Sequence, residues 1–525
     1  DQSKIVFREP STVSLTPMQR ATAWFFLVMV LLFLVQALVG GAAAHYRADL
    51  NSFFGIPLED FLPFNLMRTW HVQLALFWVS TSFLAAGLFL VPMLTRKPDR
   101  KGQAPLAYLL LAALFIVVVG SLLGELLGQR GYFGALWSWL GNQGWEYLDL
   151  GKLWQILLTV GMILWVIILL RGLRKRLASE SAANLPWMFF YAALALPVVY
   201  ALGIIADHSQ KFPIADFWRF LVVHLWVEDF LELFTTVMVA VMLVLLGVVR
   251  EKVALRVIVL DIILYSAGGV IGTAHHWYWT GTPASVLSLG AFFSALEVIP
   301  LLFLSIEAWT FMRIGGRRPD EAKNSFPHKW AVMFLIAVGF WNFLGAGVFG
   351  FLINLPIINY WETGTVLTAN HGHAAMMGVY GMLAVAFAVF AFRYFIPAEK
   401  WSEKAMKISF WSLNIGLAGM VVLNLFPVGI MQLWEAVNNG YYAARSMGFI
   451  TNDTVVFFEW LRLPADLLFI IGGVLPLLWM AVRAALHRGN HQPVRDDQDL
   501  ELFIEDDSSD AAAVSGGSTP DSARG

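Results

Sequence analysis

The amino-acid sequence predicts an all-α integral membrane protein, a bundle of twelve transmembrane helices. Of its 525 residues, 58% are hydrophobic and only 14% are charged, whereas soluble domains carry about 25% charged residues. Apolar stretches also recur along nearly the whole chain, and most reach the roughly 20 residues that a helix needs to cross a bilayer. These observations exclude a soluble enzyme and a nucleic-acid-binding protein, and they make the lipid bilayer the expected surroundings.

Twelve apolar segments follow one another along the chain. Strands of a membrane barrel are about 10 residues long and alternate in polarity, which these segments do not, so each is interpreted as a helix. The segment 216–249 differs from the others because it carries charged residues at its centre. The predicted spans are 20–43, 66–94, 105–128, 152–173, 186–206, 216–249, 253–275, 285–312, 329–354, 365–396, 406–432 and 455–485.

Lysine and arginine mark every second loop between these segments. Basic loops of membrane proteins face the cytoplasm, so both ends of this chain are expected there. The basic loops include Arg96, Arg174, Arg250, Arg317 and Lys404. The acidic residues expected to reach toward the outer face are Asp207, Asp229 and Glu362.

Three regions follow from this pattern. Residues 1–19 form a cytoplasmic segment, residues 20–485 form the membrane domain, and residues 486–525 form an acidic tail rich in Ser, Gly, Ala and Asp. A segment of that composition has little apolar surface to bury, so the tail is predicted to be disordered in the cytoplasm. Cysteine is absent, which excludes disulfides, iron–sulfur clusters and covalently attached c-type haem.

Histidines within the apolar segments are the strongest functional signal. A charged group at the centre of a membrane helix costs about 2.5–3.5 kcal/mol, whereas neutral histidine is the commonest protein ligand for metals. A structural cluster of hydrogen-bonded histidines is the alternative interpretation. Six histidines lie within or at the ends of these segments, namely His71, His224, His275, His276, His371 and His373.

The spacing of these histidines indicates two haems and a further metal. His371 and His373 lie two residues apart, about 200° around a helix, so they can serve haems on opposite faces of it. His71, on another helix, can complete a six-coordinate haem suited to electron transfer. Glu228 lies four residues after His224 and shares its helix face. Together with the adjacent His275 and His276, these residues offer three imidazoles and one carboxylate, a set that favours iron over copper.

With these residues the sequence resembles the haem–copper oxidase superfamily, and within it the catalytic subunit of nitric oxide reductases. The resemblance covers about residues 20–485. Oxygen-reducing members of the superfamily carry a tyrosine at the position of Glu228, where it supplies an electron and a proton for O–O cleavage. Nitric oxide reductases carry glutamate there and use a non-haem iron. The resemblance therefore implies a twelve-helix bundle of the haem–copper oxidase type that reduces nitric oxide.

The resemblance also implies roles for individual residues. Glu297 and Glu232 match acidic residues near the iron and are expected to act as proton donors or structural supports, with a hydrogen-bonded buried carboxyl as the alternative. Glu146 matches a carboxylate that binds calcium, a cation that prefers oxygen ligands. The implied haem and iron ligands are His71 and His373 for a low-spin haem b, His371 for a high-spin haem b, and His224, His275, His276 and Glu228 for the non-haem iron.

The expected electron donor is quinol, because the chain looks most like the quinol-dependent reductases. In that subfamily the positions of His45, Asp49 and Asp466 lie at the quinol pocket, where a histidine can accept a proton and a carboxylate can pass it on. Capping at the membrane interface is the alternative for His45 and Asp49. Asp49 is also shorter than the glutamate expected there. The subfamily's N-terminal extension, which holds a soluble domain, is not part of this sequence, so a soluble domain is expected upstream of residue 1.

The predicted reaction joins two NO, two electrons and two protons to give N2O and water, as in denitrification. Electrons pass from quinol through the low-spin haem b to the high-spin haem and the iron. Two enzymatic alternatives stay open: the same reaction with electrons from a partner subunit that carries a c-type cytochrome, and an oxygen-reducing terminal oxidase. The non-enzymatic alternative is a transporter or a haem-carrying assembly subunit. A homodimer is compatible with the sequence.

Overall fold

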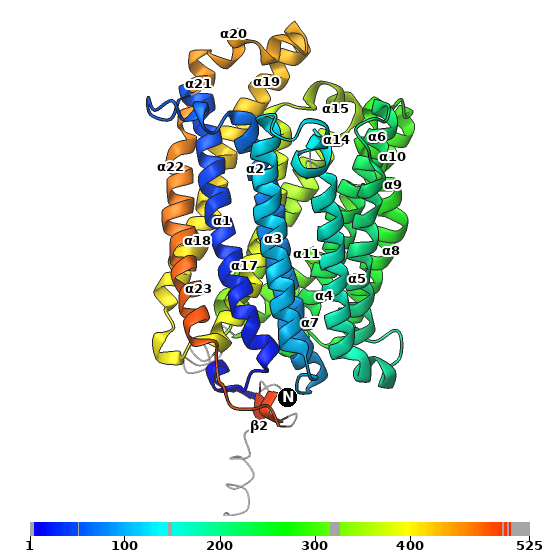
Figure 1. Cartoon of the computed structure of the whole chain (residues 1–525), viewed down its shortest axis with the longest axis vertical. Helices are drawn as coiled ribbons and strands as arrows, with labels where there is room; N and C mark the ends of the chain where they lie inside the picture. Colours follow the sequence, from blue (N-terminus) through cyan, green and yellow to red (C-terminus); the bar gives the residue numbers. More distant parts are fainter. Residues whose placement is uncertain are drawn as a thin grey trace, which may run out of the picture.

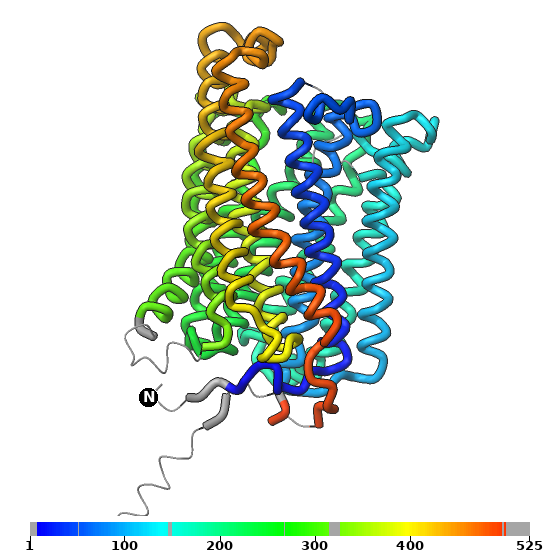
Figure 2. Tube along the Cα trace, turned by 90° about the vertical axis from the view of Figure 1, so that its left-hand side faces the viewer, coloured from blue at the N-terminus to red at the C-terminus, as the bar shows by residue number. Residues whose placement is uncertain are grey.

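The computed structural model describes residues 5–50, 52–144, 150–315, 326–495, 498–500 and 503–505. These residues form long helices that stand side by side in one upright bundle (Figure 1). Seen from a second side, the segments near both chain ends lie at the lower end of the bundle (Figure 2). The connection between α19 (Phe426–Asn439) and α21 (Asp453–Trp460) lies at the upper end.

Eleven helical runs of the described residues are long and apolar enough to cross a membrane. Each coincides with one of the predicted spans, so the chain is a multi-pass integral membrane protein. The runs are Pro17–Asp49, Phe64–Thr95, Gln103–Gln129, Lys152–Ser179, Leu185–Ile205, Glu251–His276, Ala284–Arg313, Lys329–Asn354, Val366–Phe395, Glu403–Asn439 and Asp453–His487.

The remaining predicted span, 216–249, is also helical but is more polar than the other eleven. It passes through α6 (Phe212–Val222), the π-helical η7 (Val223–Phe230) and α7 (Leu231–Leu245). The charged side chains that lower its mean hydropathy belong to Asp216, Arg219, Glu228, Asp229 and Glu232. Most of them are buried, so this run turns its polar face toward the interior of the bundle.

The helices are numbered here as in Figure 1. The first half contains α1 (Pro17–Asp49), α2 (Phe64–Thr95), α3 (Gln103–Gln129), α4 (Lys152–Ser179), α5 (Leu185–Tyr200), α6, α7, α8 (Glu251–Ile263) and α9 (Val270–Gly272). The second half contains α10 (Ala284–Leu296), α11 (Ile299–Gly315), α13 (Lys329–Trp341), α14 (Gly350–Asn354), α15 (Pro356–Glu362), α16 (Val366–Gly372), α17 (Met382–Phe395), α18 (Glu403–Met420), α19 (Phe426–Asn439), α20 (Met447–Ile450), α21 (Asp453–Trp460), α22 (Arg462–Leu467) and α23 (Leu475–His487).

Several spans contain a π-helical segment, in which backbone hydrogen bonds join residues five positions apart instead of four. Such segments are rare and are often found at functional sites. The π-helical segments within the spans are η7, η8 (Leu264–Gly269), η11 (Asn342–Phe349), η12 (His373–Gly381), η14 (Val421–Leu425) and η16 (Leu468–Val474). Two of the six histidines, His224 and His373, therefore lie in π-helical segments.

Two spans lie at the centre of the bundle. In α2 and in the run Val366–Phe395, 83% of the apolar window is buried, against 33% in α1. The Ser82 hydroxyl of α2 donates a hydrogen bond to the carbonyl of Ala384 in α17, at 2.7 Å. A hydroxyl needs such a partner inside an apolar bundle. These two central spans carry His71, His371 and His373.

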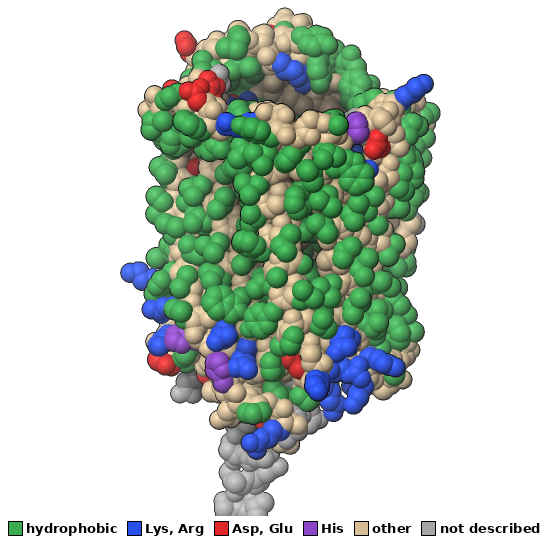
Figure 3. All heavy atoms as spheres, in the orientation of Figure 1, with side chains coloured by type: hydrophobic (Ala, Val, Ile, Leu, Met, Phe, Trp, Pro, Cys, Tyr) green, Lys and Arg blue, Asp and Glu red, His purple; other side chains and the backbone are tan. Residues whose placement is uncertain are grey.

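The surface of the bundle agrees with a position inside a membrane. Hydrophobic side chains form a continuous belt over the middle of the visible face, and Lys and Arg gather at the lower end (Figure 3). We call this lower end, which contains Arg96, Arg174 and Arg250, the basic end.

The two ends of the described chain meet at the basic end. Strand β1 (Ile5–Phe7) pairs antiparallel with strand β2 (Phe503–Glu505), with Val6 opposite Ile504. Glu9 also accepts hydrogen bonds from the Arg393 guanidinium, the shorter at 3.1 Å. The tail 486–525 was predicted to be disordered, but its residues Phe503–Glu505 pair with the segment 1–19, because a strand can bury its backbone groups against another strand even in an acidic segment.

Candidate metal and haem centre

Four side chains converge on one point inside the bundle. His224 and Glu228 come from η7, and His275 and His276 come from the 3₁₀-helical turn η9 (Thr273–His276). One ligand atom from each of the four lies within 4.8 Å of those of the other three. Glu228 Oε2 lies 2.9 Å from His224 Nδ1, and Glu228 Oε1 lies 3.3 Å from His276 Nε2. The structure thus brings together the four residues expected to hold the non-haem iron.

The donor atoms of this cluster fit a cation. The Nε2 atoms of His275 and His276 lie 2.9 Å apart, so either one donates to the other or, with both protons on Nδ1, both lone pairs point at a shared cation. His224 Nδ1 lies beside the Glu228 carboxylate but has no hydrogen bond with suitable geometry. Three nitrogen atoms and one carboxylate pointing at a common centre match the ligand preferences of a divalent transition metal.

Aromatic side chains and one backbone contact hold this cluster in place. The Phe220 ring stacks on His276, with 4.6 Å between ring centroids and 5° between ring planes. The hydroxyl of Tyr380, from η12, donates a short hydrogen bond to the carbonyl of Val227. This bond satisfies a backbone carbonyl of the π-helical segment that lies between the two ligands His224 and Glu228, so η12 supports the geometry of η7.

The acidic residues around the cluster are buried. Glu297 is 3% exposed and Glu232 is 7% exposed. Glu297 Oε1 lies 3.8 Å from His224 Nε2, and its other oxygen accepts a hydrogen bond from the Ser294 hydroxyl at 3.4 Å. Glu297 is therefore next to the ligand set, whereas no contact between Glu232 and the four ligands lies within ion-pair distance in the described part of the chain.

Asp229, one of the acidic residues expected to reach toward the outer face, is buried inside the bundle beside the metal cluster. The side chain is fully buried, and its Oδ2 atom lies 3.9 Å from His224 Nε2. The reason is the π-helical turn: residues five apart are stacked in a π-helix, so Asp229 returns to the side of His224. An α-helical interpretation rotates it about 100° away from Glu228, and the sequence carries no other signal for this position.

Two histidines face each other across the gap between α2 and η12. The rings of His71 and His373 have centroids 5.9 Å apart and an angle of 27° between their planes. His71 Nδ1 is 3.1 Å from the Gln36 carbonyl, and His373 Nδ1 is 2.8 Å from the Ala369 carbonyl. Each ring thus places Nδ1 at a backbone carbonyl, and Nε2 is the nitrogen that a metal would use. In this structure each Nε2 atom lies 3.3 Å from a side-chain nitrogen, that of Gln36 for His71 and that of Arg462 for His373. This arrangement fits the two axial ligands of one six-coordinate haem.

His371 turns away from this pair. Its Nδ1 atom lies 2.8 Å from the carbonyl of Gly345 in η11, whereas His373 approaches Arg462 of α22, with 3.3 Å between His373 Nε2 and the guanidinium. The two histidines therefore contact different helices, as their spacing predicts. Arg462 was not predicted to contact a haem ligand, since a contact between residues 89 positions apart leaves no local pattern.

The residues expected to bind quinol lie near the end opposite the basic end. His45 Nε2 is 3.4 Å from Asp49 Oδ2, and the aromatic rings of Phe53, Phe54 and Trp460 surround the imidazole. Asp466 is paired with Arg462 at 3.0 Å and lies beside Gly41, which is one helical turn before His45. The three residues thus belong to one region, in which Asp466 already has a cationic partner. Glu146, the expected calcium ligand, lies outside the described residues.

Two acidic residues at this end have pKa values shifted in opposite directions. Glu362 is 2% exposed and accepts a hydrogen bond from the Thr368 hydroxyl at 2.5 Å. Burial raises its pKa from near 4.5 to about 7. Asp207 is half-buried, and hydrogen bonds from Ser209 lower its pKa. Of the two, only Glu362 combines burial with a pKa near neutrality.

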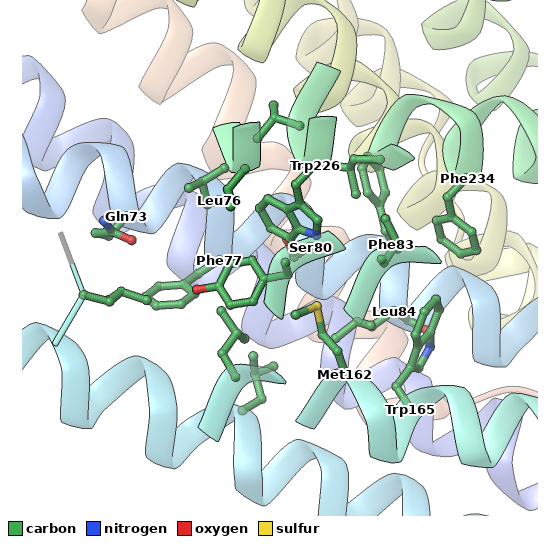
Figure 4. Close-up of a pocket in the computed structure, with 18 of the residues that line it drawn as sticks. Gln73, Leu76, Phe77, Ser80, Phe83, Leu84, Met162, Trp165, Trp226 and Phe234 are labelled. Carbon is green, nitrogen blue, oxygen red and sulfur yellow. The ribbon is translucent and has the colours of Figure 1, made fainter. Parts of the chain in front are cut away.

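An apolar cavity of about 60 Å3 lies beside η7. The cavity lies between α2, α4, α5 and the helical run α6–η7–α7. The side chains of Phe77, Leu84, Met162, Trp165 and Trp226 are among those that line it (Figure 4). Trp226 and Val227 belong to its lining and are two of the three residues between His224 and Glu228. The cavity therefore offers space for a small uncharged molecule next to the ligand-bearing segment.

Most of the chain matches one known protein family. The family model described as cytochrome c and quinol oxidase polypeptide I matches residues 20–468. The chain belongs to this family. It is therefore an oxidoreductase of the haem–copper oxidase superfamily, and the predicted membership in that superfamily is confirmed.

Two individual relatives extend this result. A nitric oxide reductase subunit from Stutzerimonas stutzeri is 28% identical over 457 residues, which cover 85% of this chain and 91% of the relative. A solved structure of a heme-copper terminal oxidase dimer shares the fold with a TM-score of 0.63, covering 92% of this chain and 87% of that one. The latter is only 15% identical, so it supports the fold of this family member and carries no information about its substrate.

Proposed function

We propose that this chain is a membrane nitric oxide reductase that converts two NO, two electrons and two protons into N2O and water. This proposal rests mainly on one observation, the presence of the Glu228 carboxylate within the histidine cluster. The carboxylate lies 2.9 Å from His224 and 3.3 Å from His276. A carboxylate is a hard ligand and favours iron at this position. The 28% identity to a nitric oxide reductase subunit supports the same reaction.

The residues present fit two haems b and one non-haem iron. His71 and His373 would hold a low-spin haem b, His371 a high-spin haem b, and the cluster of His224, His275, His276 and Glu228 the iron. When bound, these groups would supply one-electron transfer and positively charged sites for NO. The apolar cavity beside η7 suits an uncharged diatomic substrate, because it offers few polar groups that would have to lose water.

Protons reach the metal cluster through buried acids in this proposal. Glu297 is the first candidate donor, since its Oε1 atom is 3.8 Å from His224 and has no other partner. Glu232 is a second carboxyl buried one helical turn after Glu228. A buried carboxylic acid can give up a proton where charge develops in a reaction. Glu146 would bind a calcium ion, as the family resemblance implies.

Quinol is the proposed electron donor. The pair His45 and Asp49 fits the proton acceptor and relay that quinol oxidation needs, since the two are 3.4 Å apart and Asp49 is 30% exposed. A partner subunit with a c-type cytochrome is the second candidate donor. It is favoured by one observation, that the Stutzerimonas stutzeri relative is named a subunit and is spanned almost entirely by this chain. In both versions twelve helices cross a bacterial inner membrane, with the basic end in the cytoplasm.

Gas consumption by purified protein tests the reaction. The holoenzyme should consume NO with a reduced quinol and form one N2O for each two NO. Glu228→Gln should lose most of this activity and part of its non-haem iron while both haems remain. Glu307→Gln is the matched control, because Glu307 is an exposed glutamate on α11. Full NO reduction and full iron content in Glu228→Gln would refute the ligand role. Oxygen consumption that exceeds NO consumption would favour the oxidase alternative.

A further inference from the structure

We propose that Asp229 is a positioning residue for the metal ligand His224. Its carboxylate accepts the Nε2–H of His224 and so holds the ring with Nδ1 facing the metal. This inference rests on the metal site of the proposed function but not on the identity of the substrate. Asp229 has no role in the reaction described above.

The orientation of the His224 ring determines which of its nitrogen atoms carries the proton. Its Nδ1 atom is on the cluster side, 2.9 Å from Glu228 Oε2. A neutral imidazole that binds a metal through Nδ1 carries its proton on Nε2. The side chain is fully buried, and a buried N–H without an acceptor destabilises the folded protein. Nε2 therefore needs an acceptor on the side away from the cluster.

Two carboxylates are near enough to accept a hydrogen bond from His224 Nε2 after a local adjustment. Two carboxylate oxygens lie within 4 Å of His224 Nε2: Glu297 Oε1 at 3.8 Å and Asp229 Oδ2 at 3.9 Å. The Ser294 hydroxyl donates a hydrogen bond to the other oxygen of Glu297, so that carboxyl has one partner besides its free Oε1. Among the described residues, neither oxygen of the fully buried Asp229 has a hydrogen-bond partner. His224 Nε2 has none either, so a hydrogen bond between His224 and Asp229 would satisfy the ring N–H and the carboxylate that is otherwise entirely unpaired.

The neighbouring helix leaves space around the contact between Asp229 and His224. Two glycines of the helical run α8–η8–α9 lie against it. A Cβ atom on Gly269 would come within 2.2 Å of Asp229 Oδ1, and one on Gly272 would come within 2.9 Å of His224 Nε2. Any larger residue at Gly269 would push the carboxylate out of its position. The neighbouring helix thus provides room for the Asp229 carboxylate on the outer side of the ligand ring.

A carboxylate behind a metal-bound histidine has two effects. It fixes the orientation of the ring, and it makes the metal-binding nitrogen more basic; loss of such a partner typically weakens metal binding 10–100-fold. Removal of a negative charge beside the metal also disfavours its more oxidised state. Both effects can be measured on the metal itself, without any turnover.

The test compares three variants of the purified holoenzyme. Asp229→Leu removes the acceptor, Asp229→Asn keeps an oxygen acceptor but removes the charge, and Asp261→Asn is the control. Asp261 is an equally buried aspartate on α8, also without a hydrogen-bonded oxygen, and is not within ion-pair distance of His224 in the described structure. Each protein is dialysed against a graded iron chelator, and iron per chain, haem content and the midpoint potential of the non-haem iron are measured.

The expected result is a graded loss of iron with both haems in place. Asp229→Leu should weaken iron retention roughly 10–100-fold, Asp229→Asn should weaken it less, and both should raise the midpoint potential. Asp261→Asn should match the wild type. Wild-type iron retention and potential in Asp229→Leu would overturn the proposal, as would equal losses in all three variants. If Asp229→Leu does not assemble its haems, Asp229→Asn decides: an unchanged potential overturns the proposal, and a raised potential supports it. Iron retention and the midpoint potential do not depend on NO reduction. Absence of NO reduction by the wild-type protein would therefore count against the proposed function but not against the role of Asp229.

Discussion

Gly40 of α1 offers a sharp test of the haem-binding interpretation of His71. The glycine faces the imidazole ring of His71 on α2, where a Cβ atom would lie 2.2 Å from the ring Cε1 and 2.3 Å from Nδ1. The next residue, Gly41, points elsewhere: a Cβ there would be 3.8 Å from its nearest neighbour, Asp466 Oδ2. Two adjacent glycines of one helix therefore differ in whether a methyl group reaches the proposed haem ligand.

The size of the disturbance follows from these distances. Ordinary contacts of a Cβ atom begin at 3.4 Å, so in Gly40→Ala the ring must move by at least 3.4 − 2.2 = 1.2 Å, or α1 must move away from α2. Either movement breaks or lengthens the 3.1 Å hydrogen bond between His71 Nδ1 and the Gln36 carbonyl. Overpacking of this kind costs roughly 1–3 kcal/mol, and metal ligands have to stay within about 0.5 Å of their working position.

The assay is the haem content and the reduced-minus-oxidised optical spectrum of purified protein. Gly40→Ala should lose most of the low-spin haem signal and keep the high-spin haem, whereas Gly41→Ala should keep both. The reasoning would be refuted by a Gly40→Ala protein with wild-type low-spin bands, or by an equal loss in the Gly41→Ala protein.

Two further predictions concern the histidines and the buried acid of α15. His71→Ala should remove the low-spin haem signal, while His371→Ala should disturb the high-spin haem and leave the low-spin bands, because the two residues contact different helices; spectra that change identically in two folded variants would contradict this division. Burial raises the pKa of Glu362 from near 4.5 to about 7, so between these values the folded protein binds more protons than the unfolded chain, and stability falls as pH rises through this window. Glu362→Gln should flatten that fall in melting temperature between about pH 4.5 and 7, and an unchanged pH dependence would show that Glu362 does not cause it.

Much of this architecture could be predicted from the sequence because membranes impose simple rules. Apolar length alone indicated eleven spans, and the span 216–249 could be recognised although its charged residues lower its hydropathy. The opposite directions of His371 and His373 followed from their two-residue spacing. Each of these predictions depends on neighbours within a few residues, where helix geometry is reliable.

The sequence was less informative where distant segments meet or where the helix changes its period. The contact between Arg462 and His373 joins two spans with no shared pattern. The position of Asp229 beside His224 depends on the π-helical turn of η7, which an α-helical period does not reveal. The pairing of β1 with β2 joins residues nearly 500 positions apart, and an acidic composition does not reveal that a short strand will find such a partner.

The π-helical segments also bear on how proteins of this kind can change length during evolution. Inserting or deleting one residue in an α-helix turns everything beyond it by about 100°, which in a packed membrane bundle would move every later side chain to a wrong neighbour. A π-helical turn holds one additional residue and confines that rotation to a single turn. The segment with His224, Glu228 and Asp229 can be understood as such an absorbed insertion. Deletion of a single codon between His224 and Asp229 would then restore the ordinary helix and change which carboxylates face the metal, an alteration that no single substitution achieves.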